Sequence, residues 1–201
     1  MLKQDQFVTP LLAWYDKNKR EMVWRDRGNA YYTWISEIML QQTRIEAAKD
    51  YFVRFTEELP DVRSLANVSQ ERLLKLWEGL GYYNRAKNLQ KTAKILVEEY
   101  GAQLPADYEK LLALPGIGPY TAGAIASIAY DIKVPAVDGN VLRVMMRYQA
   151  SLEDITKMSA RRRVENELTE VMPERPGDFN QAIMELGEVV CIPNGTPLCD
   201  Q

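Results

Sequence analysis

The segment LPGIGPYTAGAI, Leu114–Ile125, places two glycines and two prolines within five residues and then continues into small side chains. Pro115 disfavours helical geometry at the residue before it, so a preceding helix is expected to end there. Gly116 and Gly118 permit positive φ and leave the backbone bare. Pro119 suits the first position of a new helix, where it costs no hydrogen bond. The segment therefore predicts two helices joined by a tight turn of bare backbone.

The amides near Gly116 and Gly118 are expected to point outward at a helix N-terminus, an arrangement that suits an anion such as a phosphate. The order hydrophobic–Pro–Gly–hydrophobic–Gly resembles the helix-hairpin-helix motif of DNA-binding proteins, which grips the backbone without reading sequence. A plain corner between two helices, with glycines that serve only packing, is the alternative.

The composition is that of an ordinary globular chain. Of its 201 residues, 46% are hydrophobic and 26% are charged, which suits one large domain or two small lobes. No apolar run approaches ~20 residues, so no membrane span is expected, and MLKQDQF lacks the pattern of a secretory signal. A cytoplasmic protein is the expectation. The net charge of −3 is unusual for a nucleic-acid binder, although KNKR, RRR and NRAKNLQKTAK are either local basic patches or solvated helix faces.

The chain contains no histidine. This excludes the most common general base, any Ser-His or Cys-His nucleophile pair and every His-ligated metal site. Catalysis by this chain would have to use carboxylates, Tyr, Lys, Ser or Thr.

Apolar residues recur mostly with helical spacing, as in Leu73, Leu76 and Trp77 or in Ile183, Leu186 and Val190. Long alternating strand patterns are absent, and Gly and Pro fall between the periodic segments. We predict an all-α fold of about ten short helices.

The stretch AYYTWISEIMLQQT contains a glutamate next to an apolar face. At about 100° per residue, Trp34, Ile35, Ile38 and Met39 share one side of a helix, and Glu37 lies about 60° from Trp34. A carboxyl group there is partly desolvated, which favours its protonated form. A surface glutamate is the alternative.

Leu40 falls on the other side of this helix and is followed by Gln41, Gln42 and Thr43, where the helix is expected to end. An exposed leucine beside two amides suits a wedge that inserts into a base stack. A routine helix end is the alternative.

Five segments occur in an order typical of one family: WISEIMLQQT, LWEGLGYYNRAKNL, LPGIGPYTAGAI, VPAVDGNVLRV and FNQAIMELG…VC. From about Leu12 to Cys199, they resemble the catalytic region of MutY-like adenine DNA glycosylases, in the superfamily that joins a helix-hairpin-helix to a Gly/Pro loop and an aspartate. The resemblance implies a six-helix lobe over residues 22–130 and a second lobe from residues 1–21 and 131–201. DNA would lie in a cleft between the lobes with an adenine flipped into it.

The resemblance also implies catalytic roles. Glu37 resembles the general acid that protonates the adenine ring. Asp138 resembles the carboxylate that faces the deoxyribose and stabilises an oxocarbenium-like charge, following the two-carboxylate logic of glycoside cleavage. Asn140 resembles a residue that orients these groups. An N-cap for the helix after Gly139 is the other interpretation of Asp138, and it is compatible with the first.

Tyr120 occupies the position at which lyase branches of the superfamily carry a lysine that attacks the sugar. A phenol cannot form the Schiff base that strand cleavage requires. We therefore expect base removal without efficient lyase activity.

Further residues match DNA-contacting positions of the family. Arg20, Trp24 and Arg25 match an Arg…Trp-Arg segment that helps line the adenine pocket. Leu40, Gln42 and Tyr82 resemble residues that insert near the base pair and contact 8-oxoguanine, although a core tyrosine is the alternative for Tyr82. The remaining expected DNA contacts are Gln41, Thr43, Gly116, Ile117, Gly118 and Tyr120.

Cys191 and Cys199 are the two cysteines. The family places four cysteines here around a [4Fe–4S] cluster, which two thiolates cannot hold. The resemblance implies a cluster in the full-length protein, absent or incomplete in these 201 residues, with the sequence ending inside the cluster loop. A disulfide is the alternative, disfavoured by a reducing cytosol.

The sequence therefore predicts a monofunctional glycosylase for adenine opposite 8-oxoguanine or guanine in double-stranded DNA. The expected protein is monomeric, bacterial, cytoplasmic and nucleoid-associated, and its preference for 8-oxoguanine is weakened because the family's C-terminal domain is missing. A bifunctional endonuclease III-like glycosylase/lyase and a non-catalytic helix-hairpin-helix binding module are the alternatives.

Overall fold

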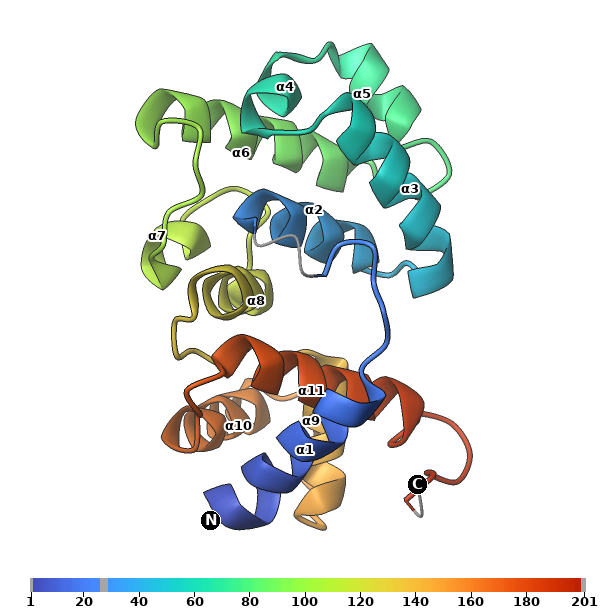
Figure 1. Ribbon diagram of the computed structural model, residues 1–201, viewed down its shortest axis with the longest axis vertical. Helices are drawn as coiled ribbons and strands as arrows, with labels where there is room; N and C mark the ends of the chain where they lie inside the picture. Colours follow the sequence, from blue (N-terminus) through green and yellow to red (C-terminus); the bar gives the residue numbers. More distant parts are fainter. Residues whose placement is uncertain (1, 26–28, 200–201) are drawn as a thin grey trace. The chain divides into compact units, whose positions relative to one another are not determined.

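The computed structural model describes residues 2–25 and 29–199 (Figure 1). Helices and no strands occur within these ranges, which confirms the all-α class and the expected abundance of short helices. The chain forms two compact units, which we call the hairpin unit (Glu21–Ile125) and the terminal unit (Met1–Arg20 with Ala126–Gln201). Their boundaries lie at residues 20/21 and 125/126, and the second falls inside helix α8, whereas the sequence placed them at 21/22 and 130/131.

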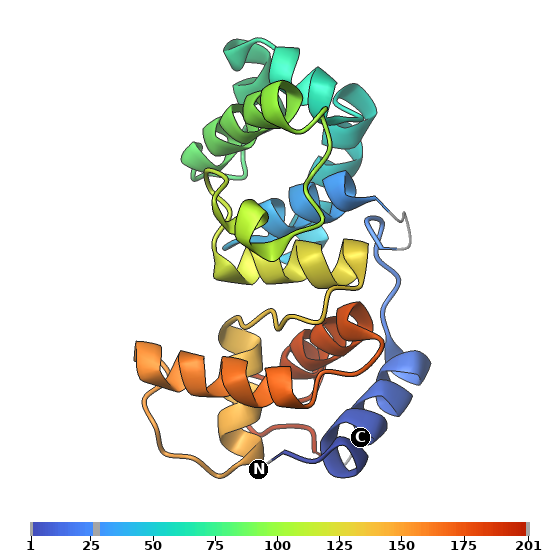
Figure 2. The same ribbon diagram turned by 90° about the vertical axis from the view of Figure 1, so that its left-hand side faces the viewer.

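The hairpin unit arranges its helices in a ring (Figure 2). Helix α2 packs against α3, and α4 packs against α6. Phe52, Phe55, Leu73 and Trp77 are fully buried in its core. The helices are α2 (Ala30–Leu40), α3 (Ile45–Glu58), α4 (Val62–Asn67), α5 (Gln70–Leu76), α6 (Asn84–Glu99), α7 (Tyr108–Leu112) and the first part of α8 (Pro119–Tyr130).

Side-chain caps set several helix starts. Asn29 accepts a hydrogen bond from the Tyr31 amide at 2.9 Å and starts α2. Asp61 starts α4 through a capping box with Ser64, and Asp107 starts α7. Such caps satisfy amides that have no partner inside the helix.

The terminal unit packs α11 (Pro176–Val189) against α1 (Thr9–Asn18) and α9 (Gly139–Tyr148). It also contains the π-helical segment η1 (Gln4–Val8), α10 (Met158–Glu170) and the end of α8. Its core includes Tyr15, Met145, Phe179 and Ile183. In the described part of the chain, no helix combines the length and the apolar character needed to span a membrane.

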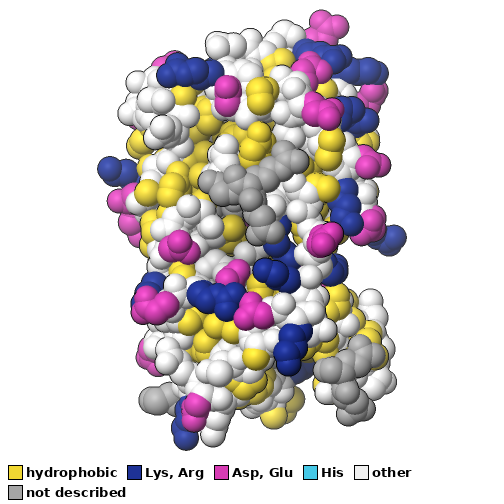
Figure 3. All heavy atoms as spheres, viewed as in Figure 1, with side chains coloured by type: hydrophobic (Ala, Val, Ile, Leu, Met, Phe, Trp, Pro, Cys, Tyr) yellow, Lys and Arg dark blue, Asp and Glu magenta, His cyan; other side chains and the backbone are white. Residues whose placement is uncertain are grey.

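Basic and acidic side chains are mixed on the face shown in Figure 3. In the RRR cluster, Arg163 pairs with Glu153 and Glu167, and Arg161 donates to the Val137 carbonyl. At least these two arginines have partners within the protein and are not simply a solvated basic patch.

Gly177 provides a test of close packing in the terminal unit. A Cβ at this position would lie 2.8 Å from both the Ile128 Cα and the Ser127 carbonyl oxygen, so Gly177→Ala has to displace backbone. We expect the free energy of unfolding, measured by urea denaturation, to fall by about 1–3 kcal/mol.

Gly139→Ala is the matched control, because a Cβ there would meet no atom within 4 Å. We expect it to change stability by no more than about 0.5 kcal/mol. Equal destabilisation by the two substitutions would contradict this account of Gly177.

Candidate active site

Glu37 lies inside the hairpin unit on α2, and its side chain is 9% exposed. Buried residues run without a break along this helix from Thr33 to Met39. The expected desolvation of Glu37 is therefore present, but α2 has no broad solvent-facing side opposite its apolar face. Leu40 is half-buried, and the expectation of an exposed leucine was wrong because the end of α2 is covered as well.

Tyr120 meets Glu37 directly. Its phenol hydroxyl donates a hydrogen bond to Glu37 Oε2 at 2.7 Å. Tyr120 is the second residue of α8, so the hairpin that begins this helix also places the phenol against the buried carboxyl group. A hydroxyl donor at this distance holds the carboxyl group in one orientation. The sequence identified both residues but did not predict the bond between them.

The hairpin turn has the bare backbone that its sequence predicts. Gly116 adopts φ +78°, where residues with a Cβ are strained. Gly118 does not use the positive φ that glycine permits, and a Cβ there would meet no atom within 4 Å. Among the described residues, the N–H groups of Gly116 and Gly118 meet no protein acceptor. Both glycines are exposed, which leaves their amides available to an anion, and Ile117 between them is buried.

Two side chains of helix α6, Asn88 and Thr92, contact the hairpin turn. Thr92 donates from Oγ1 to the Pro115 carbonyl at 2.7 Å. The Asn88 Cβ lies so close to Gly116 that a Cβ on the glycine would come within 2.8 Å of it. These contacts fix the turn, and the sequence analysis missed both α6 residues because their partners lie more than twenty positions away.

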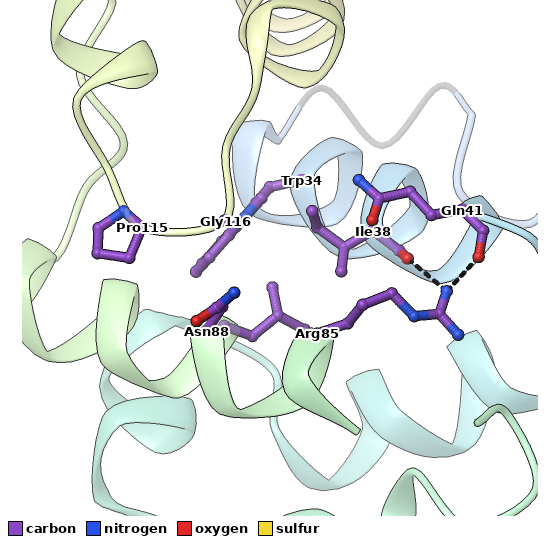
Figure 4. A pocket seen from close by; sticks show the side chains of 8 residues that line it. Trp34, Ile38, Gln41, Arg85, Asn88, Pro115 and Gly116 are labelled. Carbon is purple, nitrogen blue, oxygen red and sulfur yellow. Dashed lines mark hydrogen bonds between the residues drawn. The ribbon is translucent and has the colours of Figure 1, made fainter. Parts of the chain in front are cut away.

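A small cavity of about 50 Å³ lies next to this support (Figure 4). Such a volume holds a few water molecules at most and is too small for a purine. It is therefore not a base-binding pocket. Its lining residues come from α2, α6 and the hairpin turn: Trp34, Ile38, Gln41, Arg85, Asn88, Leu89, Pro115 and Gly116.

Asp138 lies in the terminal unit and caps α9. Its Oδ1 accepts from the Val141 amide at 2.8 Å, and its Oδ2 accepts from Asn140 Nδ2 at 2.9 Å. Arg143 in turn donates to Asn140 Oδ1 at 2.8 Å. The expected N-cap is therefore present, and Asn140 orients Asp138 while its own amide is oriented by Arg143, which the sequence analysis did not identify.

Burial raises the pKa of the Asp138 carboxyl above its usual value, and the hydrogen bonds from Val141 and Asn140 oppose that rise. The group is thus held in a site that disfavours its charged form, although three donors surround it. A buried carboxyl group with a shifted pKa is typical of functional positions.

The segment before Asp138 is clamped by Asn180, which is 1% exposed. Its Oδ1 accepts from the Ala136 amide at 3.1 Å, and its Nδ2 donates to the Val134 carbonyl at 2.9 Å and to Ser127 Oγ at 2.8 Å. The sequence analysis missed Asn180. Its only signal in the sequence is an amide that follows the apolar Phe179 in FNQAI.

Arg20, Trp24 and Arg25 fall into different units. Arg20 belongs to the terminal unit, where its backbone N–H and Nε donate to the buried Glu185 Oε1 at 2.6 and 3.0 Å. Trp24 packs edge-on against Phe52 in the hairpin unit, with ring centroids 5.6 Å apart. Arg25 is half-buried. Their expected role in an adenine pocket stays a prediction.

The turn after α2 and the turn before α6 present the other expected DNA contacts. Gln41 donates from Nε2 to Thr121 Oγ1 at 3.4 Å, and Thr43 is half-buried. Gln42 and Tyr82 are exposed and have positive φ, of 59° and 46°. Non-glycine residues adopt this conformation rarely, and it often marks functional turns.

Cys191 and Cys199 are both free thiols, half-buried and exposed respectively. Arg147 lies 3.4 Å from the Cys191 sulfur, and Arg143 donates to the Cys191 carbonyl. Over residues 2–25 and 29–199, no group of three or more Cys, His, Asp or Glu side chains could hold a metal ion.

Comparisons with known proteins identify similar sequences. Residues 35–173 match the model of a family described as HhH-GPD superfamily base excision DNA repair protein. The chain is 46% identical to the adenine DNA glycosylase of Mus musculus, over 96% of this chain and 39% of that protein. It is 40% identical to the adenine DNA glycosylase of Buchnera aphidicola subsp. Schizaphis graminum (strain Sg), over 96% of this chain and 56% of that protein. The chain thus spans only about half, or less, of these relatives.

Solved structures show the same fold. A thermostable thymine-DNA glycosylase superposes with a TM-score of 0.87 at 24% identity, over 98% of this chain and 91% of that chain. Endonuclease III in a non-covalent DNA complex superposes with a TM-score of 0.81 at 24% identity, over 100% and 92%.

The raised pKa of Asp138 predicts how stability depends on pH. From the unfolded pKa of about 3.9 up to the folded pKa, the native state binds more protons than the unfolded state, so native stability falls as pH rises. Asp138→Asn removes this titration. As pH rises from about 4, we expect the variant to gain stability relative to the native chain until the folded carboxyl group is fully ionised. Urea unfolding at several pH values measures this difference.

Asp154→Asn is a control of opposite sign. Hydrogen bonds from Thr156 lower the pKa of Asp154, so the native chain gains stability as pH rises and this variant should fall behind it. If Asp138→Asn follows the same direction as Asp154→Asn, the buried-carboxyl account is wrong.

Proposed function

Because the chain belongs to the HhH-GPD superfamily of base excision DNA repair proteins, we propose that it is an adenine DNA glycosylase. Its substrate is adenine opposite 8-oxoguanine or guanine in double-stranded DNA, and its reaction is hydrolysis of the N-glycosidic bond. The similar adenine DNA glycosylases of mouse and Buchnera support this assignment.

The observation that carries the proposal is the buried Glu37 carboxyl bonded to the Tyr120 phenol. A chain without histidine needs another general acid, and a desolvated glutamate retains a proton better than an exposed one. Tyr120 holds that group at the start of α8, immediately after the phosphate-gripping turn. Base protonation is therefore assigned to Glu37.

The reaction is a dissociative substitution at the sugar. Protonated Glu37 gives its proton to a ring nitrogen of adenine, the bond between C1′ and the base breaks, and adenine leaves with the electron pair. The carboxylate of Asp138 stabilises the positive charge that develops on the sugar. Water then bonds to C1′ and its proton passes to a carboxylate, which regenerates the acid.

Tyr120 excludes strand cleavage by the lyase route from the proposed reaction. Strand cleavage by the lyase route needs an amine that forms a Schiff base with C1′, and the phenol of Tyr120 cannot supply one. The product is an abasic site in an intact strand, which argues against the bifunctional endonuclease III-like alternative.

The exposed amides of Gly116 and Gly118 bind a DNA phosphate in this proposal. The exposed turns that carry Gln42 and Tyr82 enter the duplex at the mispair, with Leu40 behind the first of them. We further propose that the protein acts as a monomer in the cytoplasm of a bacterium, associated with the nucleoid.

The thiols of Cys191 and Cys199 do not make the four-ligand set of a [4Fe–4S] cluster within the described residues. A cluster in a longer protein stays a proposal that rests on these two positions. No step of the reaction above depends on it.

Glu37→Gln tests the general acid. We expect single-turnover excision of adenine opposite 8-oxoguanine to fall by at least about a hundredfold, because the amide cannot donate a proton to the departing base. The assay is run with and without alkaline workup, and strand breaks from the native chain should appear only after alkali. Full activity of Glu37→Gln would remove Glu37 from the mechanism, and breaks without alkali would restore the lyase alternative.

Tyr120 has its own test, because it both bonds Glu37 and replaces the lyase lysine. Tyr120→Phe removes the hydroxyl donor and should slow excision by up to about tenfold, the equivalent of one hydrogen bond. Tyr120→Lys should gain a covalent complex with abasic DNA that borohydride traps. The absence of trapping in a folded Tyr120→Lys protein would show that this side chain does not reach the sugar.

A further inference from the structure

Two exposed turns of the hairpin unit share an unusual backbone feature. Gln42 follows α2 and Tyr82 precedes α6, and both have positive φ without being glycine. Tyr82 is also 63% exposed. Such conformations cost of order 1 kcal/mol or more and persist only where surrounding contacts enforce them.

One side chain contacts both turns. Arg85, in the first turn of α6, donates from Nη1 to the carbonyls of Ile38 and Met39 at 2.9 and 3.0 Å and to that of Gln41. Figure 4 shows its guanidinium beneath the end of α2, with bonds to Ile38 and Gln41. From Nη2 it donates to the carbonyls of Leu80 and Gly81 at 2.9 and 3.3 Å and to Thr43 Oγ1 at 3.5 Å.

These bonds fix the peptide groups that immediately precede Gln42 and Tyr82, the two residues with positive φ. The Gln41 carbonyl belongs to the peptide that enters Gln42, and the Gly81 carbonyl belongs to the peptide that enters Tyr82. One planar guanidinium therefore holds the plane immediately before each left-handed residue. A rotation of either turn would break bonds that also hold the other.

The chemistry of the contact requires arginine. All hydrogen-bond acceptors of Arg85 among the described residues are neutral oxygens, and two of them are carbonyls of the last turn of α2, where the helix dipole favours a cation. The guanidinium also lies 5.3 Å from the Trp77 ring centroid and 5.6 Å from that of Tyr82. Lysine has no rigid fork and cannot span both turns in this way.

We infer that Arg85 is a positioning residue that couples the 41–43 and 80–82 turns, so that Gln42 and Tyr82 meet the mispair as one rigid surface and set the preference for the base opposite adenine. This inference rests on the proposed function for its substrate, but the coupling itself is a property of the free protein.

The first measurement follows the coupling without any substrate. The amides of Thr43 and Leu80 are each hydrogen-bonded, to Leu40 and Trp77 carbonyls at 3.2 and 3.1 Å, so their hydrogen exchange reports each turn. In Arg85→Lys, both amides should exchange at least about tenfold faster. Arg72→Lys is the control, because the Arg72 side chain pairs with Glu58 on the surface and bonds neither turn among the described residues, so it should leave both amides unchanged. If hydrogen exchange became faster at only one of the two amides, the coupling would be overturned.

A second variant leaves the arginine in place. Gln42→Val strains one turn, because a β-branched residue rarely adopts the positive φ of this position. If the turns are coupled, exchange of the Leu80 amide also accelerates. An effect confined to Thr43 would overturn the inference even if Arg85→Lys did not fold.

The functional measurement is the ratio of single-turnover excision rates for adenine opposite 8-oxoguanine and opposite guanine. Arg85→Lys should reduce this ratio by about tenfold. A small displacement of Gln42 and Tyr82 should slow excision opposite 8-oxoguanine more than excision opposite guanine, because the preferred duplex depends more on their exact position. In a Gln42→Ala, Tyr82→Ala background, Arg85→Lys should change the ratio no further.

Equal losses on both duplexes, in step with lower thermal stability, would make Arg85 merely structural and overturn its role in preference. An inactive native chain would instead refute the proposed function, and the exchange experiment would still decide whether the coupling exists.

Discussion

Close packing along α8 is the constraint on which both units depend. Its residues from Thr121 to Ser127 are buried and small apart from Ile125, so neighbouring helices approach its backbone. In the hairpin unit, this places Tyr120 against Glu37 and Thr121 within reach of Gln41. In the terminal unit, Ser127 bonds Asn180 while its carbonyl lies against Gly177. A larger side chain on this helix would therefore disturb the site as well as the core.

The two carboxyl groups of the proposed reaction share one physical situation. Glu37 and Asp138 are both withdrawn from water, and each accepts hydrogen bonds from neutral groups: Glu37 from the Tyr120 phenol, and Asp138 from the Val141 N–H and the Asn140 side chain. A hydrogen bond from a neutral donor holds a carboxyl group in one orientation. Arg143 acts on Asp138 through Asn140 in this way. The arrangement is suited to acid and charge-stabilising chemistry in a chain that lacks histidine.

The sequence was most informative where one segment determines its own structure. The helix-hairpin-helix turn, the positive φ of Gly116, the burial of Glu37 and the N-cap at Asp138 all follow from residues that are close in the chain. It failed where distant parts of the chain decide: Leu40 is half-buried because the fold covers the end of α2, which helical periodicity cannot predict. Asn180 and Arg85 were missed for the same reason, since an amide after a phenylalanine and an arginine in a basic helix carry no local mark of the backbone groups they bind.

Helix α6 is the clearest case in which contacts with distant residues could not be predicted from the sequence. Its sequence NRAKNLQKTAK looks like a basic patch because of its lysines, yet the residues that organise the hairpin unit are Arg85, Asn88 and Thr92. Their spacing of three and four places them on one side of the helix. Arg85 holds the turns at 41–43 and 80–82, whereas Asn88 and Thr92 support the hairpin turn at Pro115 and Gly116. Three exposed turns from distant parts of the sequence thus rest on one rigid helical face, so the geometry that they present to DNA in the proposed function is fixed before any DNA binds. Pre-organisation of this kind lowers the ordering cost of binding, so in the proposed function DNA affinity does not depend on the charge of the chain alone, which is −3 overall.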